Sequence, residues 1–355
     1  MPNMTLTRAI DALASGHDLS ADETAEVLAE IMHGEVSEIQ IAGFLIALRT
    51  KGETIEELTG LARTMRALAA HVPSEREGEL LDTAGTGGGR SSFNVSTTAA
   101  LIAAGAGCAV AKHGNRSATS RSGSADLLEA LGARIDLDPV GVAGCIDEAG
   151  FGFMFAPAHH QATRFVIPVR RDLAVRTIFN LLGPLTNPAG ARRQLIGVSN
   201  ADFLERMAGA LASLGVERAL VVAGEDGLDE VSASAPTKVV EVNGSAITRY
   251  VLEPREVGID ADSDDAAQGP QGGTPEQNAV VTRAILAGER VGGSAPAGEA
   301  VAVINAGAAI YAAAGVDSIA EGVELARAAL ADGRAAAALE RYVQASQRHA
   351  PVKTG

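Results

Sequence analysis

The sequence has no tryptophan, and aromatic residues make up only 3% of its 355 positions. It contains two cysteines, Cys108 and Cys145, each in an apolar run without the spacing of a metal site. These features exclude a disulfide framework and a zinc site, and two buried free thiols fit a reducing cytoplasm.

Long apolar runs are also missing. The longest, Ala99–Ala111 and Ala306–Ala314, fall short of the about 20 residues that a membrane-spanning helix needs, so we expect no membrane association. The first residues lack the basic and apolar segments of a signal peptide, which again favours a cytoplasmic protein.

Positive charge is scarce, since the formal net charge is −15. Duplex nucleic acid would be repelled by such a field, so we expect no nucleic-acid partner. An anionic small substrate would need local cations or a metal ion to offset the acidic background.

Hydrophobic residues make up 46% of the chain. In about the first seventy residues the apolar positions recur at helical spacing, which predicts that this block contains only helices. Three hydroxyl residues in this block precede Glu or Gln by three positions, which is the spacing of a capping box at a helix start. These pairs are Ser20 and Glu23, Ser37 and Gln40, and Thr54 and Glu57. The polar stretch Pro73–Glu79 then predicts a domain boundary.

From Leu80 onward, short apolar runs alternate with helical segments. Alternating strands and helices predict a parallel sheet that is covered on both faces. Asn243-Gly244 indicates a hairpin. The expected fold is therefore α/β, with a large, mostly parallel sheet flanked by helices and a small all-helical domain. The strands follow from the runs Cys108–Ala111, Arg134–Leu137, Gly152–Phe155, Gln194–Val198 and Ala219–Ala223, and the hairpin from Val239–Val242 and Ala246–Leu252.

Two loops follow predicted strands and lead into predicted helices. Gly85–Thr97 is rich in glycine and hydroxyl residues, and Lys112–Ser124 adds three cations to four Ser or Thr hydroxyls before Gly123. Backbone N–H groups, hydroxyls and a helix N-terminus suit an anion. The alternatives are a flexible linker for the first loop and a solvated basic turn for the second. Because both follow strands of one sheet, we expect them to face one crevice and bridge a ligand with two phosphate groups.

An acidic run, Gly224–Glu230, follows another predicted strand and holds four carboxylates in six positions. Carboxylate oxygens together with substrate phosphates suit Mg²⁺, although an acidic surface turn is the alternative. A further stretch, His159–Asn187, carries His159, His160, Arg164, Arg170 and Arg171 before a Gly/Pro-rich run. An arginine fork there matches a carboxylate, and a surface ion pair is the alternative.

Five strings in this order resemble the anthranilate phosphoribosyltransferases of tryptophan biosynthesis. They are GTGG…FNVST from Gly85, KHGNRS…SGSADLLEALG from Lys112, VRTIFNLLGPLTNPAG from Val175, LDEVS from Leu228 and GGTPEQNA from Gly272. The resemblance covers nearly the whole chain. It implies a Mg²⁺-dependent transfer of the phosphoribosyl group from 5-phosphoribosyl 1-diphosphate to the amine of anthranilate, with release of diphosphate.

The resemblance also implies roles for individual residues. Both loops would bind the phosphoribosyl diphosphate, through Gly85, Gly88, Gly89, Ser92, Asn94, Ser96 and Thr97 in the first and Lys112, Gly114, Asn115, Arg116, Ser117, Ser120 and Ser124 in the second. Metal ions would be held by Ser96, Asp229 and Glu230. Anthranilate would contact Gly85, Asn115, His160 and Arg170, with Arg170 binding its carboxylate. Lys112 would act in catalysis, and so would His113, as an acceptor of the amine proton.

The family architecture implies a small helical domain of residues 1–73 with about 168–190, and an α/β domain of residues 79–167 and 191–346. It further implies a homodimer formed through the helical domain. Two other readings remain open at this point: a nucleoside phosphorylase of the same fold, and a related binding protein without catalysis.

The sequence departs from the family pattern at two places. The first loop reads Gly88-Gly89-Arg90 where an Asp usually follows GTGG, and it is one residue shorter. Loss of that carboxylate predicts a weakened second metal site and less inhibition by high Mg²⁺. Gln161 and Thr163 stand where a Pro and a bulkier residue are common, so the selectivity for the acceptor stays open.

Overall fold

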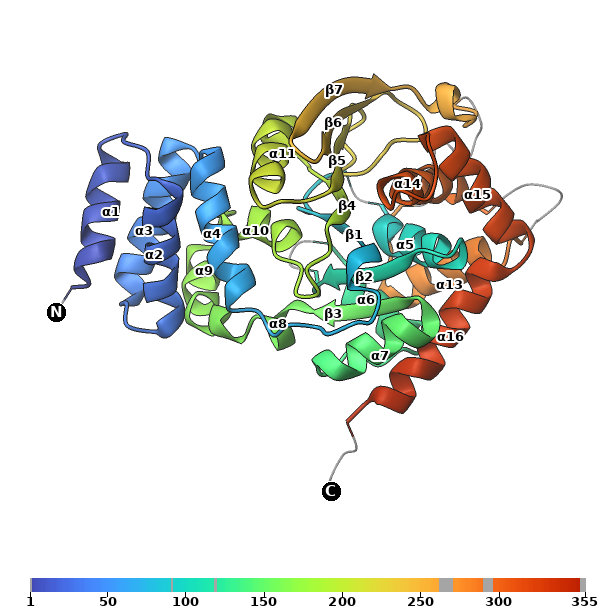
Figure 1. The fold of residues 1–355 in the computed structure, drawn as a ribbon, viewed down its shortest axis with the longest axis horizontal. Coiled ribbons are helices and arrows are strands. Elements are labelled where there is room, and N and C mark those ends of the chain that lie inside the picture. The colour runs from blue at the N-terminus through green and yellow to red at the C-terminus, as the bar shows by residue number, and fades with distance from the viewer. Residues whose placement is uncertain (1, 91, 118–119, 262–270, 290–295, 352–355) are drawn as a thin grey trace.

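The computed structural model describes residues 2–90, 92–117, 120–261, 271–289 and 296–351. The N-terminal helices stand at one end of the molecule, and a sheet with its covering helices forms the rest (Figure 1). The N-terminal helices are α1 Met4–Ala14, α2 Ala21–His33, α3 Glu38–Lys51 and α4 Ile55–Ala67. Two later helices, α9 Ile167–Leu173 and α10 Phe179–Leu185, pack against α3 and α4.

The predicted capping residues begin these helices. Ser20 accepts a hydrogen bond from the Glu23 N–H (3.2 Å), and the Glu23 carboxylate accepts one from the Ser20 N–H (2.8 Å). Ser37 caps α3 in the same way, but the Gln40 side chain instead bonds the backbone of Asn3 at the start of α1. The second half of that capping box is thus used to join two helices.

A seven-stranded sheet has the order β3-β2-β1-β4-β5-β6-β7. Its first five strands run parallel, and β6 and β7 form the antiparallel hairpin that Asn243-Gly244 predicts. This confirms the expected fold class. The strands are β1 Leu80–Gly85, β2 Ala109–Gly114, β3 Phe151–Phe155, β4 Arg193–Gly197, β5 Arg218–Gly224, β6 Thr237–Asn243 and β7 Ala246–Leu252.

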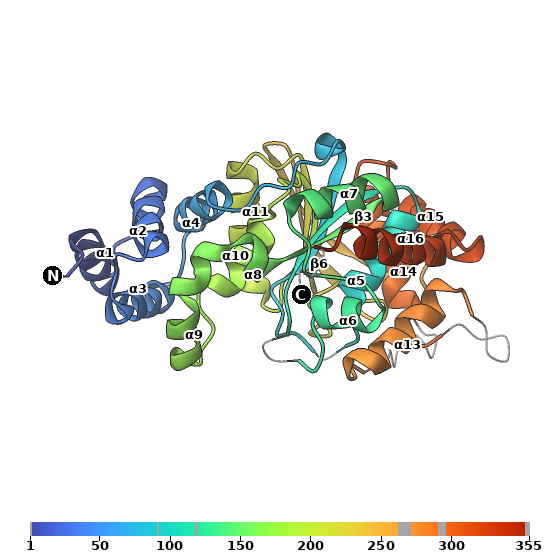
Figure 2. The ribbon, with the colours of Figure 1, turned by 90° about the horizontal axis from the view of Figure 1, so that it is seen from below.

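Helices cover both faces of the sheet (Figure 2). Side chains of β5 alternate between two hydrophobic cores: Leu220 and Val222 join one core, and Ala219 and Val221 join the other. The second core also contains the N-terminal helices, so the helical domain and one sheet face share a core. The other helices are α5 Val95–Gly105, α6 Ser124–Ala130, α7 Pro139–Ala149, α8 Ala156–His159, α11 Leu204–Ser213, α13 Pro275–Leu286, α14 Glu299–Ala312, α15 Ile319–Ala331 and α16 Arg334–His349, with 3-10 turns at Glu77–Glu79, Gln161–Phe165, Ala201–Phe203 and Pro254–Val257.

The predicted strand Arg134–Leu137 is wrong, because this segment pairs with no strand and connects α6 to α7. Its apolar side chains Ile135 and Leu137 are buried, which produces the strand-like alternation. The backbone N–H of Arg134, however, donates to the Ser346 hydroxyl (3.0 Å) on α16. The segment is therefore extended and buried against a helix. Across the described residues, no helix is long and apolar enough to cross a membrane.

Candidate active site

The strand order reverses between β1 and β4. From β1 the chain moves to β2 and β3 on one side, and then returns to β4 and β5 on the other. In open parallel sheets, ligands bind beyond the carboxyl ends of the strands at such a reversal. The two predicted anion loops follow β1 and β2, and the acidic run follows β5, so all three lie at this edge.

The first loop is anchored to its neighbours by backbone hydrogen bonds. Thr86 N–H donates to the carbonyl of Gly197 at the end of β4 (2.9 Å), and Arg90 N–H donates to the carbonyl of Gly227 in the acidic run (2.8 Å). A flexible linker would lack such fixed partners, so the linker alternative is wrong.

Glycines let this loop lie directly on Asp229. Gly87 and Gly88 have φ values of +63° and +87°, a region that favours glycine. A Cβ on Gly89 would lie 2.6 Å from Asp229 Oδ1, and one on Gly85 would lie 3.4 Å from Asp229 Oδ2. The loop backbone therefore approaches the acidic run too closely for a side chain at Gly89.

The loop ends in the first turn of α5, whose hydroxyls are placed differently. Thr97 is fully buried, and its Oγ1 has no hydrogen-bond partner among the described residues. The Ser92 hydroxyl donates to the carbonyl of Phe93 within the loop. Asn94, which precedes α5, does not cap the helix with its side chain. The N-cap side chain thus leaves the first-turn N–H groups of α5 to other partners, which suits an anion.

Asn94 instead ties the two loops together. Its Nδ2 donates to the carbonyl of Ser122 (3.1 Å), and its Oδ1 accepts from the Ser122 hydroxyl (3.0 Å) and from Asn278 Nδ2 (2.8 Å). Asn278 lies on α13, within the GGTPEQNA string, and is 2% exposed. These bonds fix the spacing between the loops.

Lys112 lies in β2 and is only 1% exposed. Its Nζ donates to the carbonyl and hydroxyl of Thr83 in β1 and to Ser96 Oγ (3.4 Å) at the start of α5. Burial lowers the pKa of Lys112 to about 8, although the charges of Asp82 and Glu230 act to raise it. The ammonium group is therefore largely charged at neutral pH and lies beside the first loop.

Buried Asp82 positions the strand that carries Lys112. Its carboxylate accepts hydrogen bonds from the His113 N–H (3.0 Å) and from Asn187 Nδ2 (2.7 Å). Asn187 also donates to the carbonyl of Ala111 (2.8 Å). Burial raises the pKa of Asp82 to about 6, and Lys112, Asn187 and the backbone oppose that shift.

The second loop folds back on itself at Gly123, where a Cβ would lie 2.4 Å from the Ser117 N. Inside the loop, the hydroxyls of Ser117 and Ser120 are 2.6 Å apart, and Ser124 begins α6. Gly114 ends β2, and a Cβ there would lie 3.1 Å from Ser124 Cβ. The loop therefore returns to the end of its own strand.

One cation of the second loop points to neighbouring carboxylates. Arg116 Nη1 lies 2.7 Å from Asp126 Oδ1 and 2.6 Å from Glu129 Oε2, and its guanidinium carbon lies 5.6 Å from the Phe155 ring centre. Its backbone N–H donates to the Asn115 side chain. The Arg116 charge is therefore matched within the protein.

Asp229 and Glu230 form an acidic pair beside both loops. Burial raises the pKa of Glu230 to about 8, with Asp229 raising it further and Lys112 and the Ser96 N–H lowering it. Burial also raises the pKa of Asp229, whereas the hydrogen bond from the Gly87 N–H and the charge of Arg176 act to lower it. Among the described ion pairs, neither carboxylate has a Lys, Arg or His within 4.0 Å. Desolvated carboxylate oxygens without an ion-pair partner, beside the backbone of Ser96, fit a hard cation such as Mg²⁺.

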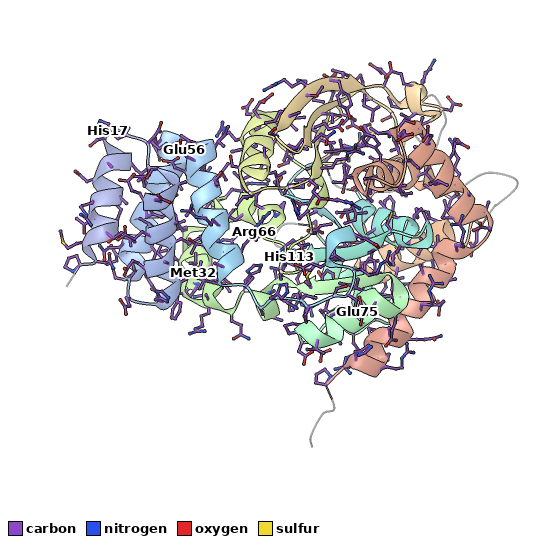
Figure 3. All side chains as sticks on the ribbon, in the orientation of Figure 1. His17, Met32, Glu56, Arg66, Glu75 and His113 are labelled. Carbon is purple, nitrogen blue, oxygen red and sulfur yellow. The ribbon has the colours of Figure 1, made fainter. Side chains whose placement is uncertain are left out.

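A second group of residues lies on the side of the helical domain. The rings of His113 and His160 are 5.0 Å apart, and His113 Nδ1 is 3.0 Å from the carbonyl of Gly183 on α10. His113 lies near the middle of the molecule, between the N-terminal helices and the C-terminal ones (Figure 3). Burial lowers the pKa of His113 to about 3 and of His160 to about 4, so both rings are neutral at physiological pH.

Arg170 lies on α9, with its guanidinium carbon 5.5 Å from the Phe179 ring centre. Burial lowers the pKa of Arg170. Among the described hydrogen bonds and ion pairs, none involves its guanidinium. A partly buried cation without an internal acid is suited to a carboxylate from a ligand.

Sequence reasoning missed several residues that shape this site. Asp82 and Asn187 hold Lys112 and His113 in place, and Asn278 holds Asn94. Arg176 donates to two carbonyls of the first loop. The only sequence signal was that Arg176, Asn187 and Asn278 lie within the strings that carry the family resemblance.

Comparisons with known proteins agree with this geometry. Residues 77–336 match the model of the glycosyl transferase family, a/b domain, and residues 7–69 match that of the glycosyl transferase family, helical bundle domain. The anthranilate phosphoribosyltransferase of Rubrobacter xylanophilus is 52% identical over 97% of this chain and 98% of its own length. That of Herpetosiphon aurantiacus is 47% identical over 97% and 99%.

Solved structures of such enzymes have the same fold. That of anthranilate phosphoribosyltransferase from Thermus thermophilus superposes with a TM-score of 0.87 at 46% identity, over 96% of this chain and 99% of that one. The enzyme from Saccharomyces cerevisiae, in complex with PRPP and Mg, gives a TM-score of 0.85 at 26% identity, over 98% and 99%. On these two domains and these full-length relatives, the chain belongs to the anthranilate phosphoribosyltransferases of the glycosyl transferase family.

Proposed function

We propose that this protein transfers the phosphoribosyl group of 5-phosphoribosyl 1-diphosphate (PRPP) to the amine of anthranilate and releases diphosphate, a step of tryptophan biosynthesis. The observation that carries the proposal is the meeting of two anion loops, a buried lysine and an acidic pair at one edge of the sheet. The yeast relatives are described in complex with PRPP and Mg and with 4-fluoroanthranilate, which supports the same pair of substrates here.

The donor would bind along the two loops. Gly85, Gly88 and Gly89 would offer backbone N–H groups to the anion, and the start of α5, which Asn94 does not cap, would add further N–H groups and the Ser96 and Thr97 hydroxyls. Lys112 adds a buried positive charge. The remaining donor contacts are proposed for Ser92, Asn94, Gly114, Asn115, Arg116, Ser117, Ser120 and Ser124, where Arg116 would have to leave its carboxylate partners or act through its backbone.

Mg²⁺ would be held by Asp229, Glu230 and Ser96. Burial raises the pKa of both carboxyls, so a divalent cation would relieve an unfavourable pair of desolvated acids. The described residues contain no group of three or more His, Cys, Asp or Glu arranged to hold a metal. Mg²⁺ commonly binds through one or two carboxylates and completes its shell with substrate phosphates and water.

The acceptor would bind between the second loop and the helical domain. Arg170 would bind the anthranilate carboxylate, and Asn115, His160 and Gly85 would line the rest of the pocket. The neutral rings of His113 and His160 suit an aromatic substrate because they add no charge beside it.

The difficult step is departure of diphosphate from the anomeric carbon. When bound, Mg²⁺ supplies charge neutralisation on the leaving oxygens. Lys112 and the loop N–H groups stabilise the negative charge that develops there, and Arg170 with Asn115 orients the neutral amine towards the anomeric carbon. The product loses a proton from a strongly acidic anilinium-type nitrogen, so even a weak base such as His113 can accept it.

The working protein would be a cytoplasmic homodimer. Ile39 and Met4 are 84% and 64% exposed on α3 and α1, which supports an interface through the helical domain. Cys108 and Cys145 are free thiols, which supports a reducing compartment. The functional domains would be residues 1–73 with about 168–190, and residues 79–167 with 191–346.

A fluorescence assay tests the proposal. Anthranilate fluorescence should fall when purified protein, PRPP and Mg²⁺ are combined, and the loss should require all three. Lys112→Ala is the matched inactive control. A nucleoside phosphorylase would instead release free base from a nucleoside in the presence of phosphate, and that outcome together with unchanged anthranilate fluorescence would contradict the proposal.

A further inference from the structure

Arg176 is the one side chain of the helical segment that donates to the backbone of the first loop among the described hydrogen bonds. Its Nη1 donates to the carbonyl of Gly87 (2.8 Å), and its Nη2 donates to the carbonyl of Thr86 (3.2 Å). The residue lies between α9 and α10, 89 positions along the chain from Gly87. Its own carbonyl accepts a hydrogen bond from Arg49 Nη1 (2.7 Å) on α3. Arg176 therefore connects the helical domain to the loop.

The backbone just before Arg176 has a strained conformation at Ala174, where α9 ends. Ala174 ends α9 with φ +52°, and it is one of only two residues other than glycine with positive φ in the described chain. Such a conformation is unfavourable for an alanine and persists only where the surroundings impose it. Here it ends the helix and turns the chain so that Arg176 reaches the loop.

The two hydrogen bonds determine which way the loop peptides face. The carbonyl and the N–H of a trans peptide point in opposite directions. With the carbonyls of Thr86 and Gly87 directed to the guanidinium, the following N–H groups point away from Arg176, and the Gly87 N–H lowers the pKa of Asp229. Gly88 must be glycine in this arrangement, because a Cβ there would lie 2.0 Å from Arg176 Nη1.

Arg176 is an exposed residue, so its hydrogen bonds contribute little to the stability of the fold. A guanidinium matches two neighbouring carbonyls better than a lysine, because its donors have a fixed planar arrangement. The residue is thus suited to setting the shape of the loop rather than to supporting the core.

We propose that Arg176 is a positioning residue for the donor: by holding the Thr86 and Gly87 carbonyls it turns the Gly87 N–H to Asp229 and the Gly88 N–H to the diphosphate, and it links this loop to the helical domain. This inference rests on the proposed function, since it assigns the loop to PRPP.

Steady-state kinetics of Arg176→Gln test the inference. We expect the KM for PRPP to rise about 10-fold, with the KM for anthranilate changed less than about twofold, because the lost contacts act on the donor loop alone. Arg176→Lys should recover only part of the loss, since one ammonium cannot bond both carbonyls in the same fixed geometry. An equal change in both KM values would overturn the proposal.

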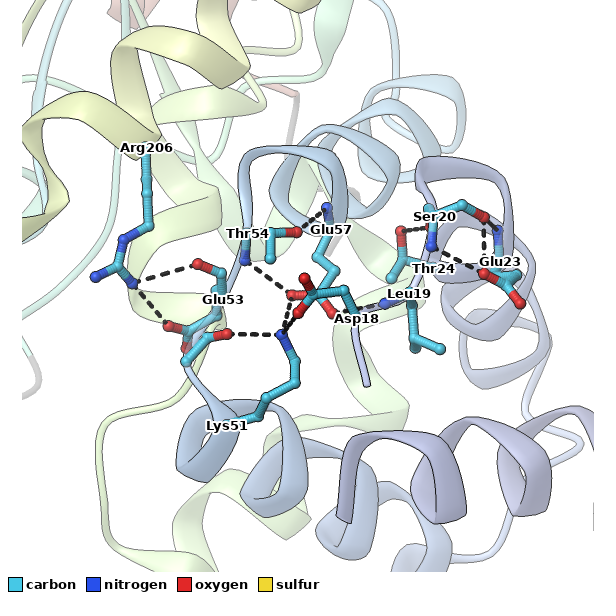
Figure 4. Close-up of polar contacts among 11 residues, drawn as sticks. Asp18, Leu19, Ser20, Glu23, Thr24, Lys51, Glu53, Thr54, Glu57 and Arg206 are labelled. Carbon is cyan, nitrogen blue, oxygen red and sulfur yellow. Dashed lines mark hydrogen bonds and ion pairs between the residues drawn. The ribbon is translucent and has the colours of Figure 1, made fainter. Parts of the chain in front are cut away.

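Two arginine variants serve as matched controls. Arg171→Gln removes an exposed cation on the same segment that pairs with Asp172. Arg206→Gln removes a contact between the domains, the 3.6 Å ion pair with Glu53 that Figure 4 shows, without touching the loop. Both should leave the KM for PRPP unchanged. If Arg206→Gln raises the KM for PRPP as much as Arg176→Gln does, loss of the contact between the domains is the cause and the proposal fails.

Hydrogen exchange separates this inference from the proposed function. In Arg176→Gln, amides of residues 86–90 should exchange faster, while those of α5 and β2 stay protected. If these amides exchange faster in Arg176→Gln but the wild-type protein does not consume anthranilate, the loop contact is supported and the proposed enzymatic function is wrong. Unchanged exchange and unchanged KM for PRPP, with only a lower Tm, would overturn the role of Arg176.

Discussion

At the scale of single residues, unpaired buried groups mark the site. Thr97 Oγ1, His113 Nε2 and His160 Nε2 are buried without a hydrogen-bond partner among the described residues. Buried polar atoms are normally satisfied, and a protein that leaves several unpaired in one region loses stability there. A substrate or bound water that supplies the missing partners at the proposed site would recover this loss.

Arg170→Gln should weaken binding of the acceptor and leave that of the donor unchanged. The guanidinium has a ring contact with Phe179 but no internal carboxylate, so its charge is available to the substrate. Loss of a charge-assisted pair worth about 1.5–3 kcal/mol should raise the KM for anthranilate roughly 10- to 100-fold. Steady-state kinetics with each substrate varied in turn measure this. A larger effect on the KM for PRPP would argue against the assigned role.

His160→Asn should reduce the sensitivity of the fold to acid. Burial lowers the pKa of His160 to about 4, so the unfolded chain binds a proton near pH 6.5 while the folded protein does not. The stabilising contribution of the neutral ring is therefore present above pH 6.5 and lost as pH falls towards 4. Between pH 7 and pH 5, the wild-type protein should lose about 1–2 kcal/mol more unfolding free energy than the variant.

Urea unfolding at both pH values measures that difference. The comparison with the variant is needed because Asp82 and Glu230 have raised pKa values and act in the opposite direction, stabilising the fold as pH falls. Equal losses in the two proteins would show that His160 is not held neutral.

At the scale of elements, the shortened first loop changes the acidic site. Arg90 Nη1 lies 3.7 Å from Asp226 Oδ2, so a cation stands by the acidic run in a loop that lacks the usual Asp. We expect the rate to rise with Mg²⁺ and then stay within about twofold across the millimolar range, because a second, inhibitory metal ion binds weakly. A Mg²⁺ titration at fixed PRPP checks this. Strong inhibition at millimolar Mg²⁺ would contradict it.

Replacing Gly89 with Asp would not simply restore the missing carboxylate. A Cβ at Gly89 would lie 2.6 Å from Asp229 Oδ1, so the new side chain would displace the residue proposed to hold the metal. The backbone of this loop lies against Asp229, so the geometry of the acidic site depends on that contact.

In the helical domain, one buried acid joins several elements. Glu57 is fully buried and accepts hydrogen bonds from the Leu19 N–H (3.0 Å), the Thr54 N–H (2.8 Å) and Lys51 Nζ (3.0 Å), as Figure 4 shows. Glu57→Gln should lower the unfolding free energy by about 2–4 kcal/mol, because Lys51 and a backbone N–H lose their charged partner. The neighbouring, exposed Glu56→Gln is the matched control and should change stability by less than about 0.5 kcal/mol.

Thermal and urea unfolding of both variants provide the measurement. If the two substitutions destabilise the protein equally, the Glu57 network does not hold these helices together.

At the scale of the whole molecule, the helical and α/β parts share a core, and arginines join the N-terminal helices to the segments that pack on them. Arg66 on α4 donates to the carbonyl of Leu185 at the end of α10 (2.6 Å). Arg49 contacts Arg176, and Arg206 pairs with Glu53. The arginines thus connect the helical bundle to the segment that carries the proposed acceptor residues and to a helix on the sheet.

Ile39→Asp should convert a dimer into monomers. Ile39 is 84% exposed on α3, and a charge buried in an apolar interface costs several kcal/mol, on the order of 3–5 for an unpaired one. Light scattering after size exclusion measures the mass. Val140→Asp, at a residue 69% exposed on α7 of the α/β part, is the matched control and should keep the wild-type mass. An unchanged dimer in Ile39→Asp would place the interface elsewhere.

Much of this molecule follows from local sequence. Capping residues such as Ser20 and Thr54 determine where helices begin, because they satisfy N–H groups within one turn. Strands of the parallel sheet are apolar because both faces are covered, and the Asn243-Gly244 turn suits a hairpin. The positions of the loops after β1, β2 and β5 were predictable because each loop directly follows an apolar run. Arg134–Leu137 was not, since alternating burial looks the same against a helix as in a sheet.

Sequence alone therefore determined most of the elements, the family and the residue types proposed to face the ligand, because each depends on neighbours within a few positions or on recurring strings. Only the tertiary structure decided that Arg176 reaches Gly87, that Asn278 holds Asn94 and that Arg116 is matched by Asp126. Such contacts join segments whose spacing along the chain carries no distance information, and they exist only once the strand order has brought those segments to one edge of the sheet.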